Sequence, residues 1–144
     1  MRRRHPELAQ RLATALRELV LLTRQATADQ KVSAQQLGVL GSLSAGPRRM
    51  TALAQEHGVR TPTMTAHVSR LEKLGAVERG ADAEDARAVA VGLTEHGRDL
   101  LREGRAARAD FLGARLAELS DEERAAVEAA LPALRKIAAP RDGA

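Results

Sequence analysis

Residues 61–79, TPTMTAHVSRLEKLGAVER, decide the fold of this chain. Apolar residues recur there at the spacing of one helical face: Met64, Val68 and Leu71. Thr61 is the expected helix cap, followed by Pro62 in the first turn, where a proline needs no amide donor. Gly75 can take the left-handed conformation that ends a helix, and the pattern then alternates as in a strand. The stretch therefore predicts a helix that runs directly into a β-strand.

The opposite face of this predicted helix is small, polar or basic. At 100° per residue it contains Ala66, Ser69, Arg70 and Lys73, flanked by Thr63 and Thr65. Short side chains allow a helix to approach base edges in the major groove of DNA, while basic ones can bind guanine or phosphate. The free amides at Thr61 can also meet a phosphate. Because polar faces are the norm on surface helices, this helix alone leaves an ordinary solvated face open as well.

A short helix before this one and a hairpin after it complete a recognisable unit. Thr51 is the predicted cap of the short helix, which ends at Gly58, a residue suited to the left-handed cap. Residues 76–79 and 87–93 alternate as two strands around an acidic turn. The order short helix, tight turn, second helix and hairpin predicts a winged helix-turn-helix, a fold that reads double-stranded DNA.

One arginine follows the acidic turn of the hairpin. Arg87 could reach a narrow minor groove, where the negative potential is strongest. Asp85 could hold its guanidinium by a paired hydrogen bond. The net negative charge of the turn argues against indiscriminate phosphate binding, which favours a single aimed arginine. An Asp-x-Arg by itself is usually a surface ion pair, so the interpretation depends on the neighbouring helices.

Helices with apolar stripes are predicted on both sides of this unit. Two capping boxes mark helix starts, Ser33 with Gln36 and Ser120 with Glu123, and Thr94 is the expected cap of a long helix. We expect a mainly α fold with a small β-hairpin wing. Residues 33–93 form the winged helix-turn-helix DNA-binding domain, and residues 1–32 and 94–144 form dimerisation helices.

The composition agrees with a dimeric helical protein. The chain has 144 residues, 44% of them hydrophobic, and a single aromatic residue, Phe111. Its core must be built from Leu, Val, Ala and Met, and a partner subunit would increase the buried area. The net charge is +4, and the excess of basic residues falls within 1–79, which favours a polyanionic partner. Without cysteine, a long apolar run or a signal core, we expect a cytoplasmic protein and no membrane contact.

Three stretches of the chain resemble the MarR/SlyA family of bacterial transcription regulators. They are residues 53–59 (LAQEHGV), residues 61–79, and residues 85–94 (DARAVAVGLT). The Asp-x-Arg of the third stretch, followed six residues later by Leu-Thr, is similar to the wing signature of that family. Because the flanking helices have the right number and length, the similarity covers nearly the whole chain.

The resemblance implies a homodimer whose first and last two helices intertwine, with the recognition helix in the major groove. It implies that Arg87 enters the minor groove and that Asp85 orients it. It also places near bases or phosphates Thr63, Thr65, Ser69 and Arg70. Family members commonly repress transcription and are released from DNA by a small-molecule effector, often an aromatic acid. This chain departs from that pattern because its single aromatic residue leaves too few rings to stack on such an acid, and without cysteine it has no peroxide-sensing thiol.

Two alternatives come from other classes of protein. An enzyme needs a nucleophile with its base, a phosphate loop or a metal site, whereas the histidines here are scattered and no such motif is present. We therefore expect no catalysis, no cofactor and no metal. A winged helix used only for protein contact would present aromatic or apolar anchors, whereas residues 61–75 present Thr, Ser, Arg and Lys. The basic arm at residues 2–4 fits either a phosphate contact or a solvated terminus.

Overall fold

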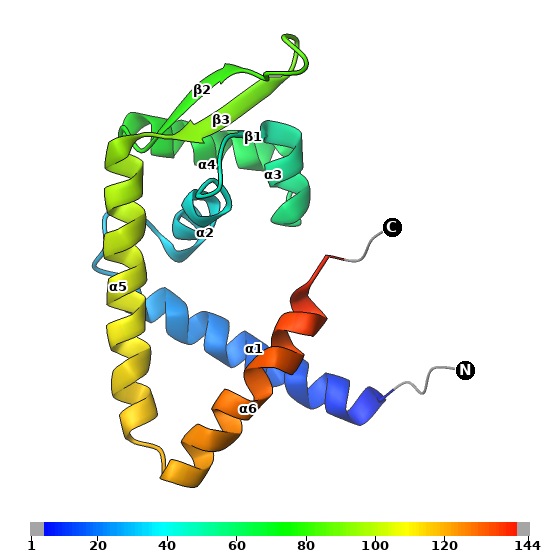
Figure 1. Ribbon diagram of the computed structural model, residues 1–144, viewed down its shortest axis with the longest axis vertical. Coiled ribbons are helices and arrows are strands. Elements are labelled where there is room, and N and C mark those ends of the chain that lie inside the picture. Colours follow the sequence, from blue (N-terminus) through cyan, green and yellow to red (C-terminus); the bar gives the residue numbers. More distant parts are fainter. Residues whose placement is uncertain (1–4, 141–144) are drawn as a thin grey trace. The chain divides into compact units, whose positions relative to one another are not determined.

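The computed structural model describes residues 5–140, so the basic arm at residues 2–4 lies outside the described residues. Figure 1 shows a mainly helical chain with one small sheet. In chain order the elements are α1 (Pro6–Ala26), α2 (Ala34–Ser42), β1 (Arg48–Arg49), α3 (Met50–Glu56), α4 (Thr61–Lys73), β2 (Val77–Ala81), β3 (Val89–Leu93), α5 (Glu95–Ala117) and α6 (Asp121–Ala138). The predicted fold class, helices with a hairpin wing, is confirmed.

The chain divides into two compact units, Met1–Arg108 and Ala109–Ala144. The first unit contains α1 to α4, the sheet and most of α5, whereas the second contains the end of α5 and all of α6. Within the described residues, no helix has the length and apolar character needed to cross a membrane. The residues proposed from the sequence to contact DNA all belong to the first unit.

The sheet has three antiparallel strands in the order β1-β3-β2. β2 and β3 form the predicted hairpin, with Val77 opposite Leu93 and Ala81 opposite Val89. Figure 1 shows the turn of this hairpin projecting past the helices of its unit. The short β1 strand was not predicted, because two residues are too few to show an alternating pattern. It pairs with Val91 and Ala90 of β3 and so ties the loop before α3 to the hairpin.

An aliphatic core lies between the short helices, the sheet and the first turns of α5. Its largest fully buried side chains are Leu37, Val39, Leu40, Leu43, Leu53, Met64, Val68, Leu71 and Val91. Burying one such side chain contributes about 1.5–3 kcal/mol, so this cluster holds the unit together without an aromatic ring. The inward side of the predicted recognition helix is thus confirmed, since Met64, Val68 and Leu71 all belong to the core.

Both predicted capping boxes are present. The Ser33 hydroxyl accepts a hydrogen bond from the Gln36 N–H at 3.2 Å, and the Gln36 side chain accepts one from the Ser33 N–H at 2.9 Å. Ser120 and Glu123 repeat the arrangement at the start of α6, at 3.1 and 2.9 Å. Each box satisfies two amides that a helix start leaves free, which explains why these two starts were readable from sequence.

Two of the three helix starts assigned to threonines are wrong. Thr51 lies inside α3, which begins at Met50 because the chain passes from β1 into the helix with Arg49 as its cap residue. Thr61 is the first residue of α4 and not its cap, because Arg60 takes the extended backbone conformation that precedes a helix. Proline tolerates the second helical position as well as the first, since neither amide has a partner within the helix.

Thr94 joins three elements at one point. Its hydroxyl accepts a hydrogen bond from the Gly97 N–H at 3.0 Å, which confirms it as the cap of α5. The same hydroxyl donates to the Gly75 carbonyl at 2.5 Å, and the Thr94 N–H donates to the Ala76 carbonyl at 3.1 Å. Gly75 has the positive φ of +72° expected of a residue that ends a helix. The end of α4, the end of β3 and the start of α5 are therefore fixed to one another.

The first and the last helix in chain order bury none of their own residues within the chain. This holds along the whole of α1 and the whole of α6. Both carry large exposed apolar side chains: Leu8, Leu16, Leu19, Val20 and Leu21 on α1, and Val127, Leu131, Leu134 and Ile137 on α6. Exposed apolar stripes of this length are typical of protein surfaces that are covered by another chain.

Candidate nucleic-acid interface

The outward face of α4 has the polar and basic character expected from the sequence. Thr63, Arg70 and Lys73 are exposed, whereas Thr65 and Ser69 are half-buried along its edges. The core residues of the same helix lie on the other side, so burial of the apolar side is what turns these hydroxyls and cations outward. Thr61 is exposed at the start of the helix.

The amino-terminal end of α4 offers fewer amides to an anion than its sequence suggests. No side chain caps this end, and Pro62 has no N–H group. The amides of Thr63 and Met64 both donate to the Arg60 carbonyl, at 3.0 and 3.1 Å. The Thr61 amide is therefore the main donor left for a phosphate at this end, and the helix dipole adds to its attraction for an anion.

Arg79 of β2 lies against α4, a contact that was not predicted. Its guanidinium donates to the Ser69 hydroxyl at 2.6 Å and lies 3.5 Å from the Glu72 carboxylate. The sequence signal that could have revealed this contact is the alternation of β2. Arg79 lies two positions after the core residue Val77, so the two side chains lie on the same face of the strand. Arg79 thus adds a guanidinium beside Ser69 and joins the hairpin to the outward face of α4.

Asp85 and Arg87 meet at the turn of the wing, as expected, but not through a paired hydrogen bond. One oxygen of the Asp85 carboxylate accepts both contacts, from the Arg87 N–H at 3.0 Å and from its Nε at 3.4 Å. A two-residue spacing brings the backbone amide into reach first, which leaves the terminal guanidinium nitrogens free. The Arg87 side chain is 94% exposed, so its charge is available to a partner.

A second ion pair holds the turn of the wing. Arg49 of β1 donates to the Asp82 carboxylate at 2.8 Å, and the same oxygen accepts the N–H groups of Glu84 and Asp85 at 3.1 and 3.0 Å. The hydrogen bond from Arg49 is the main reason that the pKa of Asp82 falls to about 2, with the two backbone N–H groups acting in the same direction. The same contact raises the pKa of Arg49.

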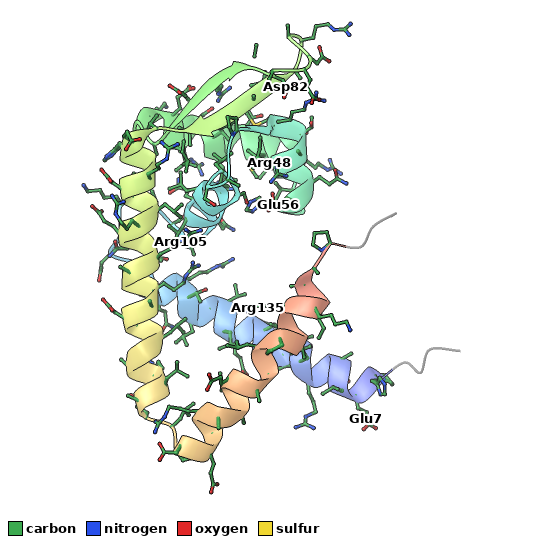
Figure 2. The ribbon with its side chains drawn as sticks, in the orientation of Figure 1. Glu7, Arg48, Glu56, Asp82, Arg105 and Arg135 are labelled. Atoms are coloured by element: carbon green, nitrogen blue, oxygen red, sulfur yellow. The ribbon has the colours of Figure 1, made fainter. Side chains whose placement is uncertain are left out.

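The other arginine of β1 points to a different partner. Arg48 donates to the Glu56 carboxylate of α3 at 3.0 Å, and Figure 2 shows the two labelled side chains beside each other, away from Asp82 near the hairpin turn. Neither β1 arginine was singled out from the sequence, because the strand that separates their directions was not recognised. Successive side chains of a strand point to opposite faces, which explains why the adjacent Arg48 and Arg49 bind residues of different elements.

These contacts define the class of protein. A helix with an outward face of hydroxyls and cations is followed directly by a hairpin whose turn presents one exposed arginine. The hairpin is anchored to that helix through Arg79 and to the preceding strand through Asp82. This arrangement is a winged helix-turn-helix, a fold whose second helix and wing face a DNA duplex.

Comparisons with known proteins narrow the class to a family. A model of the MarR family matches residues 30–88. The chain is 36% identical over 118 residues to the HTH-type transcriptional regulator Mb0904 of Mycobacterium bovis, which covers 81% of this chain and 82% of that protein. The chain belongs to the MarR family and, like its relatives, is a DNA-binding transcriptional regulator and not an enzyme.

Solved structures agree with this assignment. The transcriptional regulator BldR of Sulfolobus solfataricus is 28% identical, with a TM-score of 0.76 over 91% of each chain. BpsR of Bordetella bronchiseptica, whose DNA binding is regulated by 6-hydroxynicotinic acid, is 25% identical. Its TM-score is 0.69 over 92% of this chain and 94% of BpsR. The likeness extends well beyond residues 30–88, so the flanking helices also follow the family pattern.

Proposed function

We propose that this protein is a homodimeric repressor that binds a pseudo-palindromic site on double-stranded DNA. In each subunit residues 33–93 form the DNA-binding domain, and residues 1–32 and 94–144 supply the dimerisation helices. The observation that carries the proposal is the outward face of α4, where hydroxyls and cations stand in the same unit as the exposed Arg87.

The major groove receives α4. Its first two turns face the base edges with the hydroxyls of Thr61, Thr63 and Thr65, which can both donate and accept hydrogen bonds. Further along the helix, phosphates or guanine edges are met by Ser69, Arg70 and Lys73. Short side chains near the start of the helix permit the close approach that base contacts need, and the cations behind them set the register on the backbone.

The minor groove receives Arg87. Its terminal nitrogens are not used by Asp85, and a narrow groove concentrates the negative potential that attracts them. Three carboxylates lie in or beside the wing turn, Asp82, Glu84 and Asp85, and they disfavour loose binding to phosphates there. The wing therefore contributes one positioned contact instead of a general attraction.

Dimerisation follows from the uncovered stripes of α1 and α6. Each of these helices has no buried residue within the chain, although both carry several large apolar side chains. Covering that surface with a second subunit would bring two copies of α4 to one duplex. Half-sites about 34–36 Å apart, one helical turn, would then fit a two-fold symmetric protein.

Release by a small molecule completes the proposal. A cavity of about 400 Å³ lies where α1 ends and α2 begins, and it is lined by Arg24, Thr27, Gln30, Ser33 and Gln35 among others. This volume falls within the usual range for small-ligand sites of about 300–1,000 Å³. Arg24 offers a cation to an acidic ligand, and the polar neighbours offer hydrogen bonds, so recognition here would not require a stacking ring.

Selection from a pool of random duplexes tests the function directly. The full chain should enrich a sequence with two-fold symmetry, and footprinting should protect both half-sites. A protein-binding module without affinity for DNA would enrich no sequence at moderate salt, and that outcome would overturn the proposal.

Arg87→Ala should weaken binding to the selected duplex by on the order of 1–3 kcal/mol, because it removes one positioned charged contact. Fluorescence anisotropy at fixed salt measures the change, and circular dichroism checks that the fold is retained. Arg102→Ala is the matched control, since Arg102 pairs with Asp99 on α5 and lies outside the proposed interface. Equal affinities for the Arg87→Ala and Arg102→Ala proteins would remove the wing from the proposed contacts.

A further inference from the structure

The wing turn is connected to β1 by a partly buried ion pair. The Asp82 side chain is only 16% exposed, and its Oδ2 accepts the Arg49 guanidinium at 2.8 Å. Arg49 stands opposite Ala90 of β3, so it is fixed by the sheet and not by the turn that it holds. The contact therefore attaches a projecting loop to a rigid element.

Asp82 also organises the turn from within. The oxygen that binds Arg49 accepts the N–H groups of Glu84 and Asp85. The backbone of Asp82 donates to the Ala88 carbonyl, and the Ala88 N–H donates to the Asp85 carbonyl, both at 3.0 Å. Without its carboxylate, two amides of a short loop would lose their partner, and the conformation that these bonds select would lose its advantage.

A continuous path of hydrogen bonds runs from β1 to the wing arginine. Arg49 holds Asp82, Asp82 holds the Asp85 backbone, and the Asp85 carboxylate accepts the N–H and the Nε of Arg87. Arg87 is itself 94% exposed and has no packing to fix it. Its position relative to α4 therefore depends on the turn, and the turn depends on Asp82.

Charge gives Arg49 a second effect on the wing. Asp82, Glu84 and Asp85 would all repel a phosphate backbone. Arg49 binds the first of them and lies 3.8 Å from the carboxylate of the second. Removing Arg49 would leave both carboxylates without this compensation close to the DNA.

We propose that Arg49 and Asp82 are a positioning pair for the wing, which sets the place of Arg87 and so contributes to DNA affinity without touching the DNA. The inference rests on the proposed function, in which Arg87 contacts the duplex. It adds two residues from outside the Asp-x-Arg signature to the parts that determine binding.

A double-mutant cycle with Arg87 tests the proposal. Arg49→Ala and Asp82→Ala should each weaken binding to the selected duplex by about fivefold to fiftyfold, a part of what the Arg87 contact supplies. In an Arg87→Ala background Asp82→Ala should change affinity by less than about twofold, because there is no longer an arginine to position. Arg49→Ala should keep only the smaller loss that comes from its uncompensated carboxylates. Asp82→Asn should give an intermediate loss, since the amide oxygen can still accept the Glu84 and Asp85 N–H groups.

Arg48→Ala is the matched control for Arg49→Ala. The two arginines are adjacent in β1, but Arg48 binds Glu56 of α3 and not the wing. Arg48→Ala should show no coupling to Arg87, so it should change DNA affinity by the same factor in the wild-type and the Arg87→Ala backgrounds. Hydrogen exchange of the Glu84 and Asp85 amides in the free protein supplies a readout without DNA. Both should exchange faster in Asp82→Ala and in Arg49→Ala, and at the wild-type rate in Arg48→Ala.

The outcomes separate this inference from the proposed function. If Arg87→Ala binds as tightly as wild type, the wing contact and this inference both fail. If Arg87→Ala binds weakly while Arg49→Ala and Asp82→Ala bind normally, only the positioning pair is overturned. Losses that persist undiminished in the Arg87→Ala background would also overturn it, because they would show that Arg49 and Asp82 do not act through Arg87.

Discussion

Asp82 shows how one carboxylate can control a loop and also respond to pH. Its oxygen collects a guanidinium and two backbone N–H groups, and these donors favour the charged form. The pKa therefore falls from 3.8 to about 2 in the folded chain. A carboxylate whose folded pKa is lowered stabilises the fold at pH values above its unfolded pKa. That contribution is lost as the pH falls towards the folded value.

We accordingly expect Asp82→Asn to lower the unfolding temperature at neutral pH and to have a shrinking effect below about pH 4, where the Asp82 carboxylate of the unfolded chain gains a proton while that of the folded chain still holds its charge. Thermal unfolding followed by circular dichroism from pH 7 to pH 3 measures the difference between the two proteins. In an Arg49→Gln background the difference should depend less on pH, because the largest cause of the shift is absent. A difference that stays constant across the whole range would contradict the role given to this ion pair.

Which site residues could be predicted depended on how local their causes are. Arg87 and Asp85 are two positions apart, so their contact was visible in the chain. The contact between Arg79 and Ser69 spans ten positions, and that between Arg49 and Asp82 spans thirty-three. The second needs a strand of two residues, whose pairing comes from the fold and leaves no periodic pattern.

At the scale of the element, local hydrogen bonds again separate what could be predicted from what could not. The starts of α2 and α6 were readable because the capping side chains are themselves in the sequence. The starts of α3 and α4 have arginine at the cap position with no side-chain bond, so nothing local distinguishes them from a start one residue away. The spacing of the apolar residues within each helix could still be read from the sequence, and it identifies the side of the helix that packs against the core.

Two glycines in helices should respond in opposite ways to alanine. A Cβ on Gly41 of α2 would meet only the flexible end of Arg105, at 3.7 Å, so Gly41→Ala should stabilise the fold by about 0.5–1 kcal/mol. A Cβ on Gly97 of α5 would lie 1.9 Å from the Ala76 carbonyl oxygen. Gly97→Ala should therefore cost on the order of 1–3 kcal/mol or more, because the junction held by Thr94 must open.

Urea unfolding of the two alanine variants beside wild type gives both changes in one experiment. Each variant adds the same methyl group to a helix, so their intrinsic gains in helix propensity are matched. A higher midpoint for Gly97→Ala than for wild type would show that the start of α5 does not pack against the Ala76 carbonyl as described.

At the scale of the whole molecule, the composition already pointed to a second subunit. A chain with one aromatic residue has few large side chains with which to build a core. The structure buries aliphatic side chains from residues 32–101 in one core and leaves α1 and α6, with their own aliphatic side chains, without any buried residue. Sequence could identify the apolar stripes by their period, but not whether they would be covered within the chain or by another copy.

Leu131→Glu should break the proposed dimer. Leu131 lies on the apolar side of α6 with Val127 and Leu134, and a buried carboxylate without a partner is strongly unfavourable. Sedimentation equilibrium at micromolar concentration should give twice the 15.4 kDa of one chain for wild type and the single-chain mass for Leu131→Glu. Lys136→Glu is the control, because Lys136 stands about 140° around the helix from Leu131, and the Lys136→Glu protein should remain dimeric.

The Leu131→Glu monomer should also lose the preference for two half-sites over one, since the symmetry of the site is read by the pairing of two recognition helices. A wild-type mass of one chain would instead require α1 and α6 to stay uncovered in solution, which the size of their apolar stripes argues against.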